Sequence, residues 1–212
     1  METAQKKGIF IAVEGIDGSG KSTQLRLLAE RIQALNLRCH VTREPTDGPI
    51  GSLIRQILTG RVKADNRTVA ALYAADRIDH LTNETDGLLQ KIDSGMHVVS
   101  DRYYFSSYAY HSVDVDMEWV IQANAVSAGL LRPAVTVFLD VPVEDALERM
   151  SRGRDHVELF EREERLRQVR TLYFQAFERL KDEEKTVVID GRGTEEEVFA
   201  RLWAVVSPLL RG

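Results

Sequence analysis

A glycine-rich stretch near the amino end has residue types and spacing suited to holding phosphate groups. Residues 15–23 read "GIDGSGKST" and fit the pattern G-x-x-x-x-G-K-[ST]. Its fixed positions are Gly15, Gly20, Lys21 and Ser22. Glycines let backbone N–H groups turn around a phosphate, the lysine reaches the terminal phosphates, and the hydroxyl ligates Mg²⁺. The pattern therefore predicts a binding loop for a nucleoside triphosphate.

The whole loop is expected to contact this nucleotide. The predicted nucleotide-binding residues are Gly15, Ile16, Asp17, Gly18, Ser19, Gly20, Lys21, Ser22 and Thr23. The alternative is an ordinary glycine-rich turn that ends in a helix-capping serine. An apolar run precedes the loop and an amphipathic helical pattern follows it, which is the context that a phosphate-binding loop requires.

A second cluster with possible chemistry follows the apolar run at residues 97–101. This run ends in Asp101, and Arg102 and the aromatic-rich segment "YYFSSYAYH" come directly after it. Asp101 is predicted to meet Mg²⁺ through water, and Arg102 to hold the phosphate of a second nucleotide. Tyrosine rings at 103, 104 and 108 are expected to pack in the core.

A third cluster is the stretch "RMSRGRD", which places Arg149, Arg152 and Arg154 around Gly153. Arginines on a segment broken by glycine suit a short lid that closes over a reaction, here expected at residues 149–158. Arg154 is the first choice for the arginine that reaches the transferred phosphoryl group, which is a strong catalytic contribution in phosphoryl transfer. The alternative is that these charges form a solvated surface.

Five apolar runs must position these clusters. They lie at residues 9–13, 39–42, 97–101, 135–140 and 186–190, and helical patterns separate them. Their continuous apolar character predicts parallel strands buried on both faces. Leu25, Leu28, Ile32 and Leu35 form the apolar stripe of the first helix. We therefore expect an α/β, three-layer P-loop fold with a five-stranded parallel sheet and a lid, in one domain over residues 1–212.

Composition excludes several classes of protein. The net charge of −5 argues against non-specific binding to nucleic acid or to a membrane surface. The single cysteine cannot form an internal disulfide, and no apolar run approaches the length that spans a bilayer. These features indicate a cytoplasmic protein. A regulatory GTPase is disfavoured because the guanine-reading pattern N-K-x-D is absent.

Five segments in order make the sequence similar to a known family. "FIAVEGIDGSGKSTQ", "TREPT", "ALYAADRIDH", "SDRYYFSSYAY" and "FLDVPVEDALER" resemble the motifs of thymidylate kinases, nearly along the whole chain. The resemblance implies transfer of the γ-phosphoryl group of Mg·ATP to dTMP, giving ADP and dTDP. A deoxynucleoside kinase and a nucleotide-dependent switch are the alternatives.

The resemblance also implies roles for acceptor-site residues. Asp17 stands where the family binds the 3′-hydroxyl of the acceptor sugar, and Tyr110 where an aromatic ring crowds the 2′ position. Arg102 and Arg55 match arginines on the phosphate side. Arg77 matches the arginine that hydrogen-bonds the thymine edge.

Further matches concern the bases and the assembly. Tyr73 takes the place of the ring that stacks on thymine, and Ser107 faces the pyrimidine. His111 replaces a glutamine that is common in bacterial members, and Glu44 can orient either an arginine or a metal-bound water. Arg149 and Arg192 match positions near adenine.

Relatives are homodimers packed through the helices after the first and third strands, so a homodimer is expected here. A stripe of Val69, Leu72 and Ala75 suits either this interface or the core.

Overall fold

The sheet predicted from the apolar runs is present in the structure, a computed structural model that describes residues 7–150 and 156–211 but not the side chains of residues 156–162 and 211. Within this part of the chain, five parallel strands lie in the order β2-β3-β1-β4-β5. They are β1 (Phe10–Glu14), β2 (Cys39–Arg43), β3 (His97–Asp101), β4 (Val135–Asp140) and β5 (Thr186–Asp190). The predicted α/β architecture is confirmed, and each strand lies within one residue of its expected bounds.

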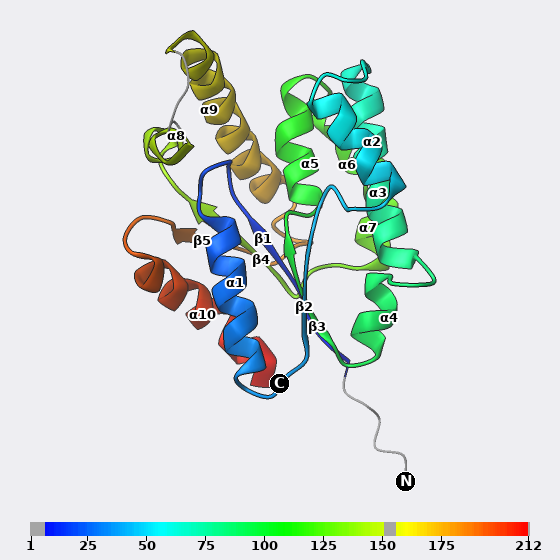
Figure 1. The fold of residues 1–212 in the computed structure, drawn as a ribbon, viewed down its shortest axis with the longest axis vertical. Helices are drawn as coiled ribbons and strands as arrows, with labels where there is room; N and C mark the ends of the chain where they lie inside the picture. Colours follow the sequence, from blue (N-terminus) through cyan, green and yellow to red (C-terminus); the bar gives the residue numbers. More distant parts are fainter. Residues whose placement is uncertain (1–6, 151–155, 212) are drawn as a thin grey trace.

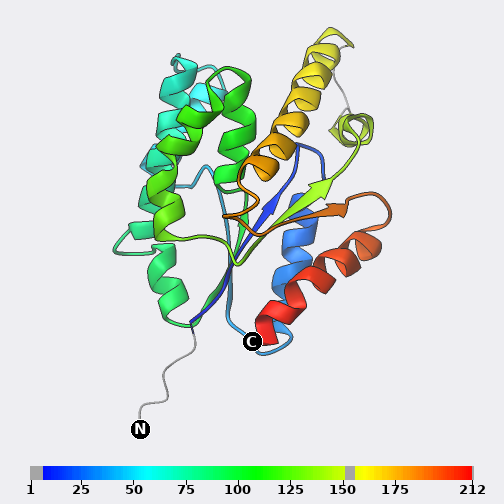
Figure 2. The ribbon, with the colours of Figure 1, turned by 180° about the vertical axis from the view of Figure 1, so that it is seen from behind.

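Helices cover both faces of the sheet (Figures 1 and 2). On one face lie α1 (Lys21–Gln33) and α10 (Glu195–Arg211), which pack on Ile11 and Val13 of β1. On the other face lie α4 (Leu88–Asp93), α5 (Tyr104–Tyr110) and α9 (His156–Arg179), against Phe10 and Ala12. Alternate residues of β1 therefore enter two different cores, as expected for a central parallel strand.

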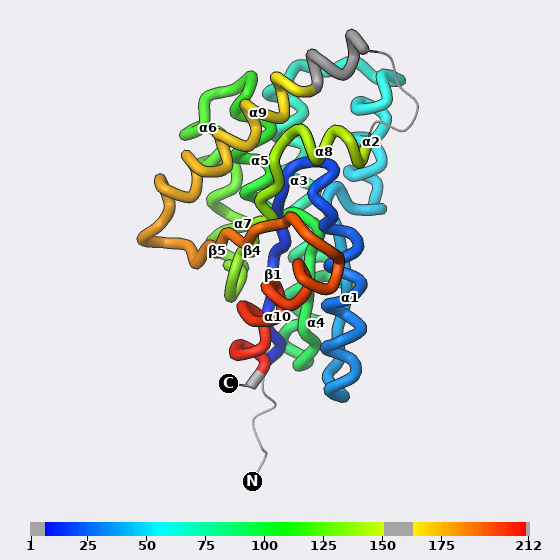
Figure 3. The backbone as a smooth tube through the Cα atoms, turned by 90° about the vertical axis from the view of Figure 1, so that its left-hand side faces the viewer, coloured from blue at the N-terminus to red at the C-terminus, as the bar shows by residue number. Residues whose placement is uncertain are grey.

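The remaining helices gather beside and above the carboxyl ends of the strands. They are α2 (Pro49–Leu58), α3 (Asn66–Thr82), the 3₁₀ turn η1 (His111–Val113), α6 (Met117–Ala123), α7 (Ala125–Leu130) and α8 (Val143–Met150). Local chemistry begins two of them: the carboxylates of Asp65 and Asp116 accept hydrogen bonds from backbone N–H groups in the first turns of α3 and α6. Figure 3 shows α2 and α8 at the end of the molecule where β1 runs into α1.

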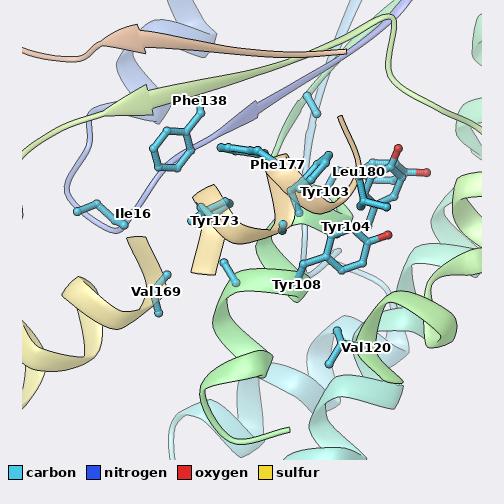
Figure 4. Packing of buried hydrophobic residues seen from close by; sticks show 14 of the residues in the cluster. Ile16, Tyr103, Tyr104, Tyr108, Val120, Phe138, Val169, Tyr173, Phe177 and Leu180 are labelled. Atoms are coloured by element: carbon cyan, nitrogen blue, oxygen red, sulfur yellow. The ribbon is translucent and has the colours of Figure 1, made fainter. Parts of the chain in front are cut away.

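The larger core is aromatic (Figure 4). Tyr103, Tyr104 and Tyr108 are at most 2% exposed, which confirms that these rings pack in the core. Tyr173 of α9 lies between the sheet and α5, with its ring centroid 4.7 Å from that of Phe138 on β4. This packing fixes α5 and α9 against the end of β1, where the phosphate-binding pattern begins.

Two expectations about burial were wrong. The strands β2 and β5 are edges of the sheet, so Val41 and Val188 are 44% and 45% exposed instead of being buried on both faces. Leu35 does not extend the apolar stripe of α1, because this helix ends at Gln33 and the chain turns through Asn36, whose φ is 58°. Leu35 is consequently 46% exposed, whereas Leu25, Leu28 and Ile32 are buried as predicted.

No helix in the described ranges is long and apolar enough to cross a membrane.

Candidate active site

The glycine-rich loop connects β1 to α1 and presents backbone amides. Gly18 and Gly20 have φ values of 81° and 91°, a left-handed conformation that glycine adopts without steric cost. A Cβ on Gly18 would lie 2.4 Å from the carbonyl oxygen of Ala146 on α8, so this position also needs a bare backbone. Gly20 is the N-cap residue of α1 and makes no side-chain cap. The first N–H groups of the helix are therefore left available to bind an anion.

Lys21 lies inside this loop. Its Nζ donates hydrogen bonds to the carbonyl oxygens of Gly15 at 3.0 Å and Ile16 at 3.1 Å, and the residue is buried. Burial, followed by repulsion from Arg102, lowers the pKa of Lys21 to about 8, although the carboxylates of Asp101 and Asp17 oppose this shift. A bound phosphate would place a negative charge next to this ammonium group and favour its protonated form.

Ser22 and Asp101 both line a groove of about 1150 Å³, together with residues of α1 and β2. In the described part of the chain, Oδ1 of Asp101 is buried and has no hydrogen-bond partner. A hydroxyl and a carboxylate, completed by water and phosphate oxygens, form the kind of oxygen donor set that Mg²⁺ binds. These two residues therefore fit the magnesium site that the sequence predicts.

Arg102 meets the phosphate-binding loop from the carboxyl end of β3. Its backbone has a φ of 71°, and its N–H donates to the carbonyl oxygen of Val13 at 3.0 Å. Its guanidinium donates to Oδ1 of Asp17 at 2.6 Å and to the hydroxyl of Tyr110 at 3.1 Å, and it stacks over the Tyr110 ring at 4.7 Å. Three of the predicted acceptor residues, Asp17, Arg102 and Tyr110, are thus in contact.

Arg77 is 1% exposed and is held on several sides. Its guanidinium donates to Oε2 of Glu44 at 2.7 Å, to the hydroxyl of Ser107 at 3.1 Å and to the side-chain oxygen of Asn124. Glu44 also lies 3.2 Å from Nδ1 of His80. Of the two roles considered for Glu44, this geometry favours the orientation of an arginine.

Tyr73 and His111 lie next to each other, with ring centroids 4.8 Å apart. Burial, and then the charges of Arg77 and Arg165, lower the pKa of His111 to about 4. The imidazole is therefore neutral at neutral pH and offers one donor and one acceptor.

Arg55 is turned toward the loop after β2. It donates to the carbonyl oxygens of Pro45 at 3.3 Å and Thr46 at 2.5 Å, and Thr46 is itself fixed by the buried carboxylate of Asp76.

The two predicted adenine-side arginines differ in their surroundings. Arg149 lies in the last turn of α8 and links two loops, since its guanidinium donates to the carbonyl oxygens of Gly18 at 3.4 Å and Gly191 at 3.5 Å. Arg192 is paired with the exposed carboxylate of Asp190 at 3.1 Å, and its role stays a prediction. Arg154 and Arg152 lie outside the described residues.

Several residues of the site were not found from the sequence. They are Glu14, Asp76, His80, Ser106, Asn124 and Tyr173. Glu14 carried one usable signal, because a charged residue directly after the apolar run 9–13 is costly to bury without a function. Tyr173 carried none, since its partner Glu14 is 159 positions away.

Comparisons with known proteins point to one family. A family model described as thymidylate kinase matches residues 13–202. A probable thymidylate kinase of Pyrococcus horikoshii is 33% identical over 97% of this chain and 99% of its own length. A probable thymidylate kinase of Methanocaldococcus jannaschii is 39% identical over 86% of both chains. A thymidylate kinase of a Synechococcus species is 36% identical over 95% of this chain and 96% of its own.

Proposed function

The chain belongs to the thymidylate kinase family, whose reaction is phosphorylation of dTMP by ATP, and from this premise we propose how its residues divide the work. The observation that carries the proposal is the contact between Arg102 and the phosphate-binding loop. A guanidinium that reaches Asp17 at 2.6 Å stands beside the loop that contains Lys21. Two cationic groups, one at the start of α1 and one directly after β3, therefore lie near each other, as required when two nucleotides meet end to end.

On the donor side, the amides of residues 15–20 and the ammonium of Lys21 bind the phosphates of ATP. Ser22 and Asp101 would hold Mg²⁺, the first directly and the second through water. The metal would neutralise charge on the phosphates when it is bound. The position of Arg149 between the loops of Gly18 and Gly191 supports a role for this arginine and Arg192 at the adenine.

On the acceptor side, Arg102 grips the phosphate of dTMP, and Arg55 adds a second guanidinium. The carboxylate of Asp17 accepts a hydrogen bond from the 3′-hydroxyl of the acceptor sugar. The ring of Tyr110 leaves no room for the 2′-hydroxyl of a ribose. The aromatic pair Tyr73 and His111 lies against the thymine.

Arg77 hydrogen-bonds the edge of the thymine, with Ser107 and Glu44 holding its guanidinium in place. Rigid placement of such a group is worth more than its charge alone, because it is not reoriented on binding.

Closure of the site is assigned to the lid at residues 149–158, with Arg154 as the arginine that stabilises the transferred phosphoryl group. Little covalent chemistry is required of the protein in this reaction, and neutralisation of charge accounts for most of the catalysis. Replacement of Arg154 by alanine should therefore lower kcat more than it changes either KM.

We further propose one domain, a cytoplasmic location and a homodimer. The dimer proposal is supported by apolar side chains exposed on adjoining helices. They are Leu53 and Leu58 of α2, Ala75 of α3, Trp119 of α6, and Val126 and Leu130 of α7. Val69 and Leu72 of α3 are only partly buried, so this stripe is available at the surface.

A coupled assay of ADP release with dTMP, dUMP, UMP, CMP and AMP tests the acceptor. We expect dTMP to be preferred, because the guanidinium of Arg77 can only donate hydrogen bonds, which suits a carbonyl oxygen of thymine and not the amino group of cytosine or adenine. A preference for AMP or CMP would contradict this assignment.

The same assay with thymidine and an Arg102→Ala variant separates the two enzymatic alternatives. Loss of dTMP turnover by about a hundredfold or more is expected if Arg102 holds the acceptor phosphate. A deoxynucleoside kinase would instead phosphorylate thymidine and tolerate the variant. Slow hydrolysis of ATP that does not depend on any acceptor would favour a nucleotide-dependent switch.

A further inference from the structure

A buried carboxylate lies close to Arg102, at the end of the strand that leads into the phosphate-binding loop. Glu14 ends β1, and its side chain is fully buried. Its Oε1 accepts hydrogen bonds from the N–H groups of Tyr103 at 2.8 Å and Ser106 at 3.2 Å. Its Oε2 accepts from the hydroxyls of Ser106 at 2.6 Å and Tyr173 at 2.9 Å. Each oxygen thus has two donors, as an ionised carboxylate requires.

The same two hydroxyls contact the guanidinium of Arg102. Its Nη1 donates to Ser106 Oγ at 2.9 Å and to the hydroxyl of Tyr173 at 3.3 Å. A hydroxyl has one proton and two lone pairs. The two hydroxyl oxygens also lie 2.8 Å apart, so their two protons are shared among the contacts with Glu14 and with each other. In either arrangement neither proton is turned toward Arg102, and a lone pair of each hydroxyl accepts from its guanidinium. The carboxylate therefore orders two acceptors for the arginine without touching it.

We propose that Glu14 and Tyr173 are positioning residues that hold the Arg102 guanidinium in the orientation that binds the acceptor phosphate. The inference rests on the proposed role of Arg102 and names residues to which the family comparisons and the sequence motifs assign no role.

The two halves of the guanidinium have different surroundings. Nη2 contacts Asp17 and Tyr110, both of which are proposed to meet the acceptor nucleotide. Nη1 contacts only Ser106 and Tyr173 among the described hydrogen bonds. When an acceptor competes for Asp17 and Tyr110, the hydroxyl pair still fixes the arginine. This separation is why we assign positioning to the buried side.

Electrostatics agree with this link. Burial raises the pKa of Glu14, and Arg102 is the strongest of the influences that oppose it, ahead of the hydrogen bonds from Ser106, Tyr103 and Tyr173. Lys21 is the other cation that interacts with this carboxylate. Arg102 thus stabilises the charge of Glu14, and Glu14 in turn orders the groups that hold Arg102.

The test compares Tyr173→Phe with Tyr104→Phe by calorimetric titration of dTMP and of thymidine. Both variants remove one hydroxyl from a buried ring that donates to a carboxylate, but the Tyr104 hydroxyl donates to Glu184, outside the site, at 2.7 Å. Thymidine lacks the phosphate and reports all contacts except those to the phosphate, which are proposed for Arg102 and Arg55. We expect Tyr173→Phe to weaken dTMP about five- to tenfold and to leave thymidine unchanged, since one hydrogen bond to a charged group is lost. Tyr104→Phe should change neither affinity.

Glu14→Gln gives a second reading. Its amide would donate to the hydroxyls and turn their protons toward Arg102, so we expect at least as large a loss of dTMP affinity. Thermal unfolding of each variant shows whether it is folded. If Glu14→Gln does not fold, Tyr173→Phe alone tests the positioning role.

Equal losses of dTMP and thymidine affinity in folded Tyr173→Phe, or no loss of either, would overturn the inference. An Arg102→Ala variant separates this result from failure of the proposed function. If Arg102→Ala binds dTMP and thymidine in the wild-type ratio, the role of Arg102 is wrong and the inference falls with it. If only Tyr173→Phe keeps that ratio, Arg102 holds the phosphate without help from Tyr173.

Discussion

Two cations in the candidate site are held in contrasting ways. Lys21 is contacted by neutral carbonyl oxygens, whereas Arg102 has the carboxylate of Asp17 and three hydroxyls around it. Their mutual repulsion contributes to the lowered pKa of Lys21. The protein's own groups therefore under-compensate the charge of Lys21, and an anionic ligand relieves this deficit. This imbalance favours binding of the highly charged triphosphate at the lysine.

The pH dependence of ATP use should report this deficit. With a pKa of about 8, Lys21 loses its positive charge as pH rises through 8, so kcat/KM for ATP should fall above that pH. In the complex the phosphates favour the charged form, so the fall in kcat should occur at higher pH. Steady-state kinetics from about pH 6 to 9.5 at varied ATP concentration measure the pH dependence of kcat/KM and of kcat. A Lys21→Arg variant keeps its charge, and its residual kcat/KM should lack the fall near pH 8; a flat wild-type profile would contradict the prediction.

Side chains that act locally could be predicted, whereas those that act through distant partners could not. The loop residues from Gly15 to Thr23 share one short pattern whose spacing is set by the phosphates. Glu14, Ser106 and Tyr173 meet only because β1, α5 and α9 pack together, and no spacing in the chain records that contact. Asn124 likewise reaches Arg77 from 47 positions away.

At the scale of elements, the strands were predictable because each is a short apolar run followed by a polar residue. Their order was not, since an edge strand such as β5 (TVVID) and an inner strand such as β3 (HVVSD) have similar apolar content. The end of α1 was missed for a related reason: Leu35 continues the helical spacing, but the turn at Asn36 ends the helix first.

The phosphate-binding loop also depends on its neighbour α8, and Gly18→Ala tests this contact. The added Cβ would lie 2.4 Å from the carbonyl oxygen of Ala146, so either the loop or the helix must move. Because small displacements of positioning groups reduce rates strongly, we expect kcat/KM for ATP to fall about tenfold or more. Steady-state kinetics with ATP and dTMP varied in turn measure this effect.

Gly60→Ala is the matched control. Gly60 is also left-handed, with a φ of 74°, but no atom lies within 4 Å of its Cβ position. Both variants should lose about 1–2 kcal/mol of unfolding free energy from the backbone conformation. Only Gly18→Ala should lose ATP turnover, and an equal loss in both would show that strain, and not the contact with α8, is responsible.

At the scale of the whole molecule, charge and apolar surface are distributed separately. The chain has a net charge of −5, yet Lys21, Arg77 and Arg102 gather at the carboxyl ends of the strands. The net charge therefore says little about the ligand, and the local cations say more. The exposed apolar side chains of α2, α6 and α7 lie on other helices than the loop and α1. An interface there leaves the phosphate-binding loop accessible.

The proposed homodimer predicts that charge on this helical face separates the subunits. Leu53 and Leu58 of α2 are 37% and 61% exposed, and replacement of both by aspartate would bury charges at a shared interface, which is costly without partners. Sedimentation equilibrium should then give the monomer mass for this variant and twice that mass for the wild type. The matched control replaces Leu35, in the turn after α1, and Val188, on β5, by aspartate; these residues are 46% and 45% exposed. The control should stay dimeric, because its charges lie outside the proposed interface on α2. If added charge in general separated the subunits, both variants would be monomers.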